Sequence, residues 1–192
     1  MKINFVRRLT ESAIMLAAST VLSMIPLIDM PFGGKLTPLS MLPVLLIAYR
    51  YGCGWGFVTS FTYGLIQMVL GLDNLTYATN WVAVIAIILL DYLVAYGVLG
   101  FGGVFRGKLK HQWLEFSLGV GIGCVLRFLC HFITGITVWA DTESAFSAVA
   151  LFSLGYNGCY MLPEMVLTVI VGVVLTRFFD LTSPDLKRVK KG

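Results

Sequence analysis

The sequence predicts an all-α membrane protein with six transmembrane helices in one bundle and both termini in the cytoplasm. Hydrophobic residues make up 58% of the 192 residues, charged residues make up 12%, and the mean hydropathy is +0.86. A soluble domain carries about 25% charged residues. The apolar residues gather in long stretches, and the basic residues lie between them. This length accommodates one membrane domain, residues 1–192, and no separate soluble domain.

Six apolar stretches are the expected helices, because about 20 apolar residues cross a bilayer. They are residues 9–27, 40–51, 55–70, 81–105, 113–138 and 152–179. The second stretch is short, so we expect it to be tilted or to lie within the bundle. Residues 26–38 contain three prolines and a Gly-Gly pair, which exclude a regular helix. This segment and two further polar loops either form a lid over one end of the bundle or are only connectors.

The charges of the connecting segments predict the orientation, since Lys and Arg favour the cytoplasmic side. The basic residues of one set of loops and of both ends are Lys2, Arg7, Arg8, Arg50, Arg106, Lys108, Lys110, Lys187, Arg188, Lys190 and Lys191. The opposite loops carry the acidic residues Asp29, Asp73, Asp141 and Glu143, with Lys35 as their one lysine. Both termini are therefore expected inside.

Four ionisable residues lie within the apolar stretches: Asp91, Arg127, His131 and Glu164. A charge in hydrocarbon costs several kcal/mol, so each requires a partner, a water-filled cavity or a ligand. On the fifth predicted helix, Arg127 and His131 continue at four-residue spacing into Gly135 and Trp139, which places them on one face. Gly135 would leave a gap where a ligand can approach closely. Asn157 lies on the sixth helix, two turns from Glu164.

Each of these residues also has a purely structural interpretation. Arg127 and Glu164 are interpreted as a structural ion pair between the fifth and sixth helices, because an isolated arginine at that depth is intolerable. His131 is either a hydrogen-bonded packing residue or part of a site. Asp91 has no cationic neighbour in its own helix, so a protein partner or a cationic ligand must balance it. Tyr92 points about 100° away, toward the same cavity or a neighbouring helix.

The usual signatures of catalysis and of metal binding are missing from the sequence. There is no Walker A, GxSxG or HExxH motif, and the four cysteines show no CxxC spacing. The two histidines lie twenty residues apart, at opposite ends of the fifth predicted helix. We therefore expect no enzyme, no cofactor and no metal site. The modest charge of +4 does not indicate a nucleic-acid partner.

Small residues in the first predicted helix form another pattern. Ala13 and Ala17 lie four residues apart, which produces a flat stripe where another helix can approach. The stripe serves either internal packing or the docking of a partner protein.

Three segments resemble the thiamin-specific S-components of energy-coupling factor (ECF) vitamin transporters, and the resemblance extends over nearly the whole chain. They are Leu90-Asp91-Tyr92 with Ala95-Tyr96-Gly97, then Arg127, His131-Phe132, Gly135 and Trp139, and then Tyr156-Asn157-Gly158 with Tyr160-Met161-Leu162-Pro163-Glu164. The resemblance implies a non-catalytic protein of a prokaryotic plasma membrane. It would capture thiamin from outside with high affinity. It would release thiamin inside after docking to a transmembrane coupling subunit that carries two ATPases.

The same resemblance implies roles for particular residues. The family's ligand contacts fall on Asp91, Tyr92, His131, Gly135, Trp139 and Asn157, and its docking stripe falls on Ala13 and Ala17. Phe152 falls where a tyrosine is usual, and Tyr63 where a tryptophan can occur. Tyr77 or Trp81 would supply a loop aromatic.

One segment departs from the family pattern. Residues 32–38 offer no carboxylate, and Lys35 would repel a cation. Two alternatives therefore stay open. The first is an S-component for a thiamin precursor or another flat vitamin, and the second is a membrane protein outside transport.

Overall fold

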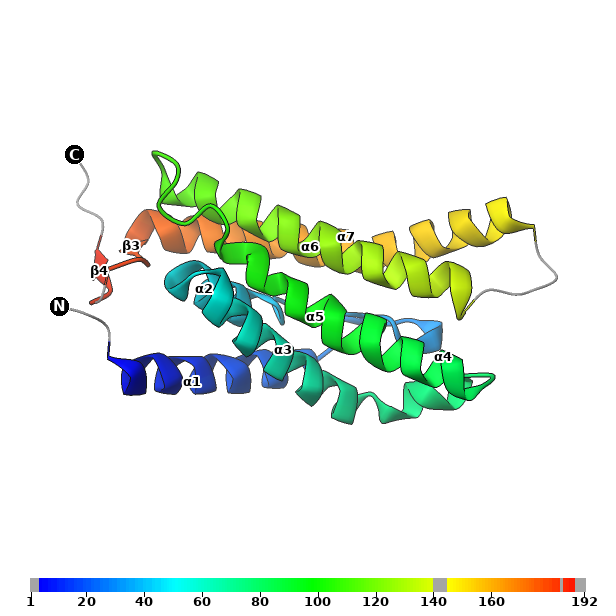
Figure 1. Cartoon of the computed structure of the whole chain (residues 1–192). Coiled ribbons are helices and arrows are strands. Elements are labelled where there is room, and N and C mark those ends of the chain that lie inside the picture. The colour runs from blue at the N-terminus through cyan, green and yellow to red at the C-terminus, as the bar shows by residue number, and fades with distance from the viewer. Residues whose placement is uncertain (1–3, 140–144, 184, 189–192) are drawn as a thin grey trace.

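The computed structural model describes residues 4–139, 145–183 and 185–188. Helices α1 to α7 run roughly along one axis and form a single elongated bundle (Figure 1). Within these described residues, three helical segments are long and apolar enough to cross a membrane: Trp81–Gly103, Gln112–Thr137 and Phe146–Phe178. A mostly helical membrane protein is therefore confirmed.

The first three helices follow the predicted stretches to within a few residues. Helix α1 (Phe5–Ser23) begins at Asn4, whose side chain accepts a hydrogen bond of 2.7 Å from the backbone N–H of Val6. Helix α2 (Leu42–Tyr51) ends at Gly52, where a φ of +87° turns the chain into α3 (Cys53–Leu70). Glycine tolerates this conformation without steric cost.

The fourth helical segment changes its winding along its length. It begins as α4 (Trp81–Ala86) and continues as the π-helix η3 (Ile87–Val94). The short helix α5 (Ala95–Gly97) and the 3₁₀-helix η4 (Val98–Gly103) complete it. The prediction of one helix here is right in extent, but it assumed a uniform α-helix.

The last two helices pack along each other over much of their length (Figure 1). Helix α6 (Gln112–Thr137) matches its predicted range to within one residue at each end. Helix α7 (Phe146–Phe178) begins six residues earlier than predicted, because its first turns include the end of the expected polar loop and the apolar residues 148–151.

Short strands and 3₁₀-helices make up the rest of the described chain. Strands β1 (Ile28–Asp29) and β2 (Lys35–Leu36) form an antiparallel hairpin around the 3₁₀-helix η1 (Pro31–Gly33). The 3₁₀-helix η2 (Leu72–Tyr77) follows α3, and strands β3 (Phe179–Asp180) and β4 (Lys187–Arg188) follow α7. The segment predicted to be non-helical is thus an ordered hairpin.

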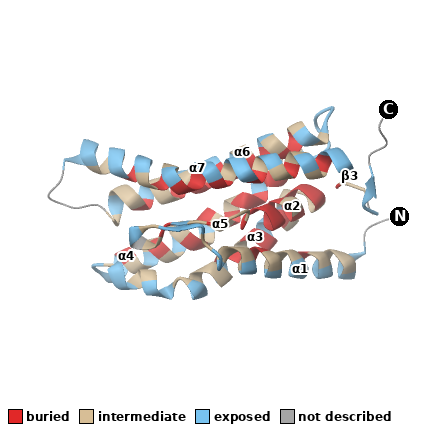
Figure 2. Cartoon of the chain, turned by 180° about the vertical axis from the view of Figure 1, so that it is seen from behind, coloured by how far each residue is buried: buried red, intermediate tan, exposed pale blue. Residues whose placement is uncertain are grey.

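Helix α2 occupies the centre of the molecule, as predicted for the short apolar stretch. Figure 2 shows it almost entirely buried, while the outer faces of the long helices are exposed. Leu45, Ala48 and Tyr49 have no exposed surface. The exposed outer faces are rich in Val, Leu and Ile, which suits a hydrocarbon surround.

Arg50 connects the two ends of the described chain. Its Nε donates to Glu11 of α1 at 2.7 Å, and its Nη1 donates to the carbonyl oxygens of Leu181 and Ser183 at 2.7 and 2.9 Å. The start of α1 and strands β3 and β4 therefore lie at the same end of the bundle (Figure 1).

Candidate functional site

A cavity of about 1050 Å³ lies at the end of the bundle opposite β3 and β4. Its walls come from the β1–β2 hairpin, η2, η3, α6 and α7. Ten residues singled out from the sequence line it: Tyr77, Asp91, Tyr92, Arg127, His131, Gly135, Trp139, Phe152, Asn157 and Glu164. All four ionisable residues of the apolar stretches thus face one cavity, where the sequence predicted two separate groups.

The carboxylate of Asp91 is held by three donors from the end of α6. The Nδ1 atom of His131 lies 2.9 Å from Oδ1, and the hydroxyl of Thr134 donates to the same oxygen. The indole Nε1 of Trp139 donates to Oδ2 at 3.2 Å. Asp91 therefore has protein partners, and its side chain is still 12% exposed toward the cavity.

The π-helix η3 determines which side chains of the fourth segment reach the cavity. Ile87, Asp91, Tyr92 and Tyr96 all line it. In an α-helix, Ile87 and Tyr96, which are nine residues apart, would lie on opposite faces. A π-helix has about 4.4 residues per turn, so two turns return to the same face. The wider winding gathers these side chains on one wall.

Tyr92 connects the same wall to the loop after α3. Its hydroxyl donates to the carbonyl of Gly71 at 3.0 Å and accepts from the Asn74 side chain at 2.9 Å. Tyr92 thus lies in the cavity wall, and its polar atom holds η2 in place.

Aromatic rings flank the mouth of the cavity. The rings of Tyr77 and Trp139 lie 5.8 Å apart at an angle of 55°, and those of Phe152 and Tyr156 stack at 5.8 Å. Two predicted aromatics do not line the cavity. Trp81 is 74% exposed at the start of α4, and Tyr63 is fully buried with its hydroxyl donating to the carbonyl of Ser19. The expectation that these two contact a ligand finds no support in their positions.

Gly135 and Asn157 join α6 to α7. A Cβ atom on Gly135 would come within 2.1 Å of the Ser153 Oγ, so the space beside this glycine is filled. Gly135 therefore permits close packing of the two helices, where the sequence predicted a gap for a ligand. The amide nitrogen of Asn157 donates to the His131 carbonyl on α6 at 3.4 Å and to the Ser153 carbonyl on α7 at 2.9 Å, and its oxygen accepts from Tyr160 at 2.8 Å.

Arg127 and Glu164 lie 4.0 Å apart, between Nη1 and Oε2, deep in the cavity. The arginine donates to the hydroxyl of Tyr96 at 3.1 Å and lies over its ring, 4.5 Å from the centroid. Oε1 of Glu164 accepts from the hydroxyls of Thr37 and Ser40 at 2.8 and 2.7 Å. The closest contacts of Glu164 therefore join α7 to the segment before α2.

The hairpin residue Lys35 lies at the mouth of the cavity, where the sequence indicated a repulsive charge. Its Nζ lies 3.8 Å from the Asp29 carboxylate across the hairpin. The residue before Lys35 is held by α7, since the backbone N–H of Gly34 donates to the hydroxyl of Tyr156 at 2.9 Å.

Several polar residues of the cavity received no role from the sequence, among them Thr134, Tyr156 and Asn74. Thr134 follows His131 by three positions, so helical spacing alone would have placed it beside Asp91's partner. Tyr156 adjoins Asn157 in a segment already singled out. No sequence signal indicated Asn74.

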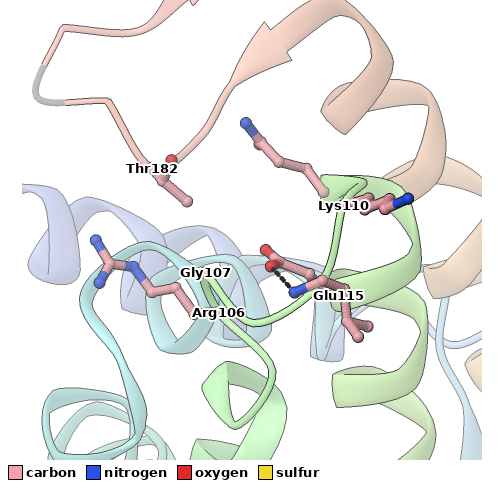
Figure 3. Close-up of a pocket in the computed structure, with 7 residues that line it drawn as sticks. Arg106, Gly107, Lys110, Glu115 and Thr182 are labelled. Atoms are coloured by element: carbon pink, nitrogen blue, oxygen red, sulfur yellow. Dashed lines mark hydrogen bonds between the residues drawn. The ribbon is translucent and has the colours of Figure 1, made fainter.

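A smaller hollow of about 330 Å³ lies at the other end of the bundle, between η4 and α6 (Figure 3). Arg106, Lys110 and Thr182 line it. Glu115 closes it by accepting hydrogen bonds from the Leu109 backbone N–H at 2.8 Å and from the Tyr49 hydroxyl at 2.6 Å. The carboxylate of Glu115 is thus occupied in holding the turn before α6.

Comparison with known proteins assigns the chain to a family. Residues 9–182 match the model of the family described as thiamine transporter protein. The chain is 32% identical to the thiamine transporter ThiT of Bacillus subtilis (strain 168), over 96% of this chain and 95% of that protein. It is 27% identical to the ThiT of Lacticaseibacillus paracasei, over 95% and 90%.

A solved structure of ThiT from Listeria monocytogenes has a similar fold. The TM-score is 0.68 at 27% sequence identity, and the match covers 88% of this chain and 92% of that one. The family matched by sequence is one of transporters, in agreement with the prediction of a protein that is not an enzyme. The chain belongs to the thiamine transporter protein family.

Proposed function

We propose that this chain is a thiamin-binding S-component of an ECF transporter. It would bind thiamin from outside the cell in the cavity around Asp91 and deliver it inward with an energising module. The observation that carries this proposal is a carboxylate held by three donors inside an apolar bundle, facing a cavity. Family membership supports it independently.

The charges of the inner cavity suit a cation. Counted at formal charge, Asp91 and Glu164 contribute −2 and Arg127 contributes +1, so −2 + 1 leaves −1. The thiazolium ring of thiamin carries one permanent positive charge. Opposite charges attract far more strongly in a low-dielectric pocket than in water. A singly charged cation would therefore neutralise the pocket.

The aromatic rings and the imidazole suit the rest of the ligand. Trp139 and Tyr77 can stack on a flat ring, and a cation over an aromatic face gains up to about 2 kcal/mol when desolvated. Nε2 of His131 is buried and has no hydrogen-bond partner among the described residues. Buried polar atoms are nearly always paired, so this nitrogen is available to a ligand.

We further propose that the protein crosses the plasma membrane of a prokaryote six times with both termini in the cytoplasm. The helical segments that support this count are α1, α2, α3, the segment from α4 to η4, α6 and α7. Arg7, Arg106 and Lys187 belong to the end of the bundle where Arg50 joins α1 to the C-terminal segment. The positive-inside rule assigns that end to the cytoplasm. The cavity then opens outward.

Ala13 and Ala17 are the proposed docking stripe for the transmembrane coupling subunit, which would carry the two ATPases. Both alanines lie on the exposed face of α1, while Ser12 and Ser19 of the same helix are buried against the bundle. Internal packing therefore does not account for the stripe, and its small side chains permit close approach of another helix.

Calorimetry on the purified protein tests the proposed ligand. Thiamin should bind tightly at one site, and the aminopyrimidine alcohol that lacks the thiazolium should bind at least 100-fold more weakly. Equal affinity for this uncharged precursor would favour the precursor transporter instead. Absence of thiamin binding, together with no association with an ATPase complex, would contradict the transport function.

A further inference from the structure

Thr134 is the buried partner of Asp91 that neither the sequence motifs nor the family comparison assigns a role. It is 1% exposed, and it lies on α6 between His131 and Trp139, the other two donors to the same carboxylate. Oδ1 of Asp91 is shared by Thr134 and His131. The hydroxyl and the imidazole are therefore linked through one oxygen atom.

The single hydroxyl proton of Thr134 has more than one acceptor within reach. Its Oγ1 lies 3.3 Å from the Cys130 carbonyl and 3.0 Å from the His131 carbonyl, and it is closer still to Asp91. A carboxylate is a stronger acceptor than a backbone carbonyl that already accepts within a helix. The proton is therefore donated to Asp91.

The arrangement of Asp91 determines which nitrogen of His131 carries a proton. An ionised carboxylate only accepts hydrogen bonds, so Nδ1, at 2.9 Å, is the protonated nitrogen. The orientation of a histidine and the tautomer it adopts are set by the hydrogen bond of its other nitrogen. Nε2 of this cavity-lining residue is buried and has no described partner, and it is then the acceptor for a ligand.

We propose that Thr134 is a positioning residue of the binding site: through Asp91 it fixes His131 with Nε2 as an acceptor for an N–H group of the ligand. This inference rests on the proposed function, since the amino group of an aminopyrimidine is such a donor. The terminal torsion of an aspartate is soft, with broad preferences. Without the hydroxyl, Asp91 keeps only His131 and Trp139 as donors, so its carboxylate is held less firmly and the orientation of His131 loosens with it.

Four variants separate this role from simple helix packing. Thr134→Val keeps the side-chain shape and removes the hydroxyl, Thr134→Ala removes it with a smaller side chain, and Thr134→Ser retains it. Thr137→Val is the matched control, because Thr137 is exposed on the same helix and bonds only the Ile133 carbonyl, at 2.7 Å, in the described chain.

Nitrogen-15 NMR of histidine-labelled protein reads the tautomer directly, without ligand. The chain has only two histidines, so His111 at the other end of the bundle is an internal reference for correct folding. In the wild type and in Thr134→Ser, His131 should show the Nδ1–H form. In Thr134→Val and Thr134→Ala, both tautomers should appear while the His111 signals stay unchanged.

Calorimetry with thiamin on the same samples provides the second readout. We expect affinity to fall about 10-fold in Thr134→Val and Thr134→Ala, and to stay at the wild-type level in Thr134→Ser and Thr137→Val. Wild-type tautomer signals and affinity in both hydroxyl-free variants would overturn the inference. A wild-type protein that shows the Nδ1–H form and binds no thiamin would overturn the proposed function alone.

Discussion

The hydroxyl of Tyr156 lies between two backbone groups of the β1–β2 hairpin. It accepts a hydrogen bond of 2.9 Å from the N–H of Gly34 and donates to the carbonyl of Pro31. A single phenol on α7 thus holds a loop whose neighbours Gly33 and Lys35 line the cavity mouth.

Replacing Tyr156 with Phe should loosen this loop over the cavity. The ring and its stacking on Phe152 remain, while two hydrogen bonds of about 1 kcal/mol each are lost. We expect thiamin to dissociate about 5- to 30-fold faster, measured by chase of radiolabelled ligand from the purified protein. An unchanged dissociation rate would mean that the loop does not retain the ligand.

Asp91→Asn should weaken thiamin binding by about 100-fold or more, since it removes the charge that balances the thiazolium. A factor of 100 corresponds to about 2.7 kcal/mol, within the range of a charge pair near the protein surface. Calorimetry measures the change. Asp73→Asn is the control, because Asp73 also lines the cavity but is exposed at its rim. Equal effects of the two variants would contradict a specific role for Asp91.

Substituting Trp for both Ala13 and Ala17 should abolish thiamin uptake into cells and leave binding by the purified protein intact. The large rings would keep a coupling helix from approaching α1 closely. Ile170→Trp, on a lipid-exposed face of α7, controls for added bulk in the membrane. Uptake that survives the double substitution would exclude this stripe as the docking face.

Gly135→Ala should destabilise the protein, because the new methyl group would meet Ser153. Overpacking of this kind costs about 1–3 kcal/mol. A thermal shift of the detergent-solubilised protein should show a lower melting temperature, and adding Ser153→Gly should restore part of it. If Gly135→Ala is neutral for stability but reduces thiamin affinity, the glycine faces the ligand, as the sequence first indicated.

Helix positions were predictable because composition alone determines them in a membrane protein. The limits of α6 follow from the apolar stretch between His111 and Val138, and the grouping of Asp91 with His131 follows from the cost of burying charge. The sequence could not show that Gly135 also packs against α7, because a missing side chain leaves room for either a ligand or a neighbouring helix. Only the position of Ser153 on α7 decides between them.

The directions in which the side chains of the fourth helical segment point could not be predicted from the sequence, for a different reason. A period of 3.6 residues places Tyr92 about 100° from Asp91 and places Tyr96 away from Ile87. Composition does not reveal a π-helix, whose winding is set by the surrounding packing. The sequence therefore singled out Asp91 and Tyr92, which line the cavity, without the geometry that brings them together with Ile87 and Tyr96.

The π-helical winding of η3 makes the site sensitive to the deletion of a single residue. Leu89 is 47% exposed and is not one of the residues that line the described cavity. Its deletion would let η3 relax toward an α-helix and rotate all that follows by about 100°. Tyr96 would leave the guanidinium of Arg127 although no residue of the cavity had been replaced. The site thus depends on the number of residues between its side chains as well as on their identity. Deleting one residue from a lipid-facing segment would damage the site more than many substitutions.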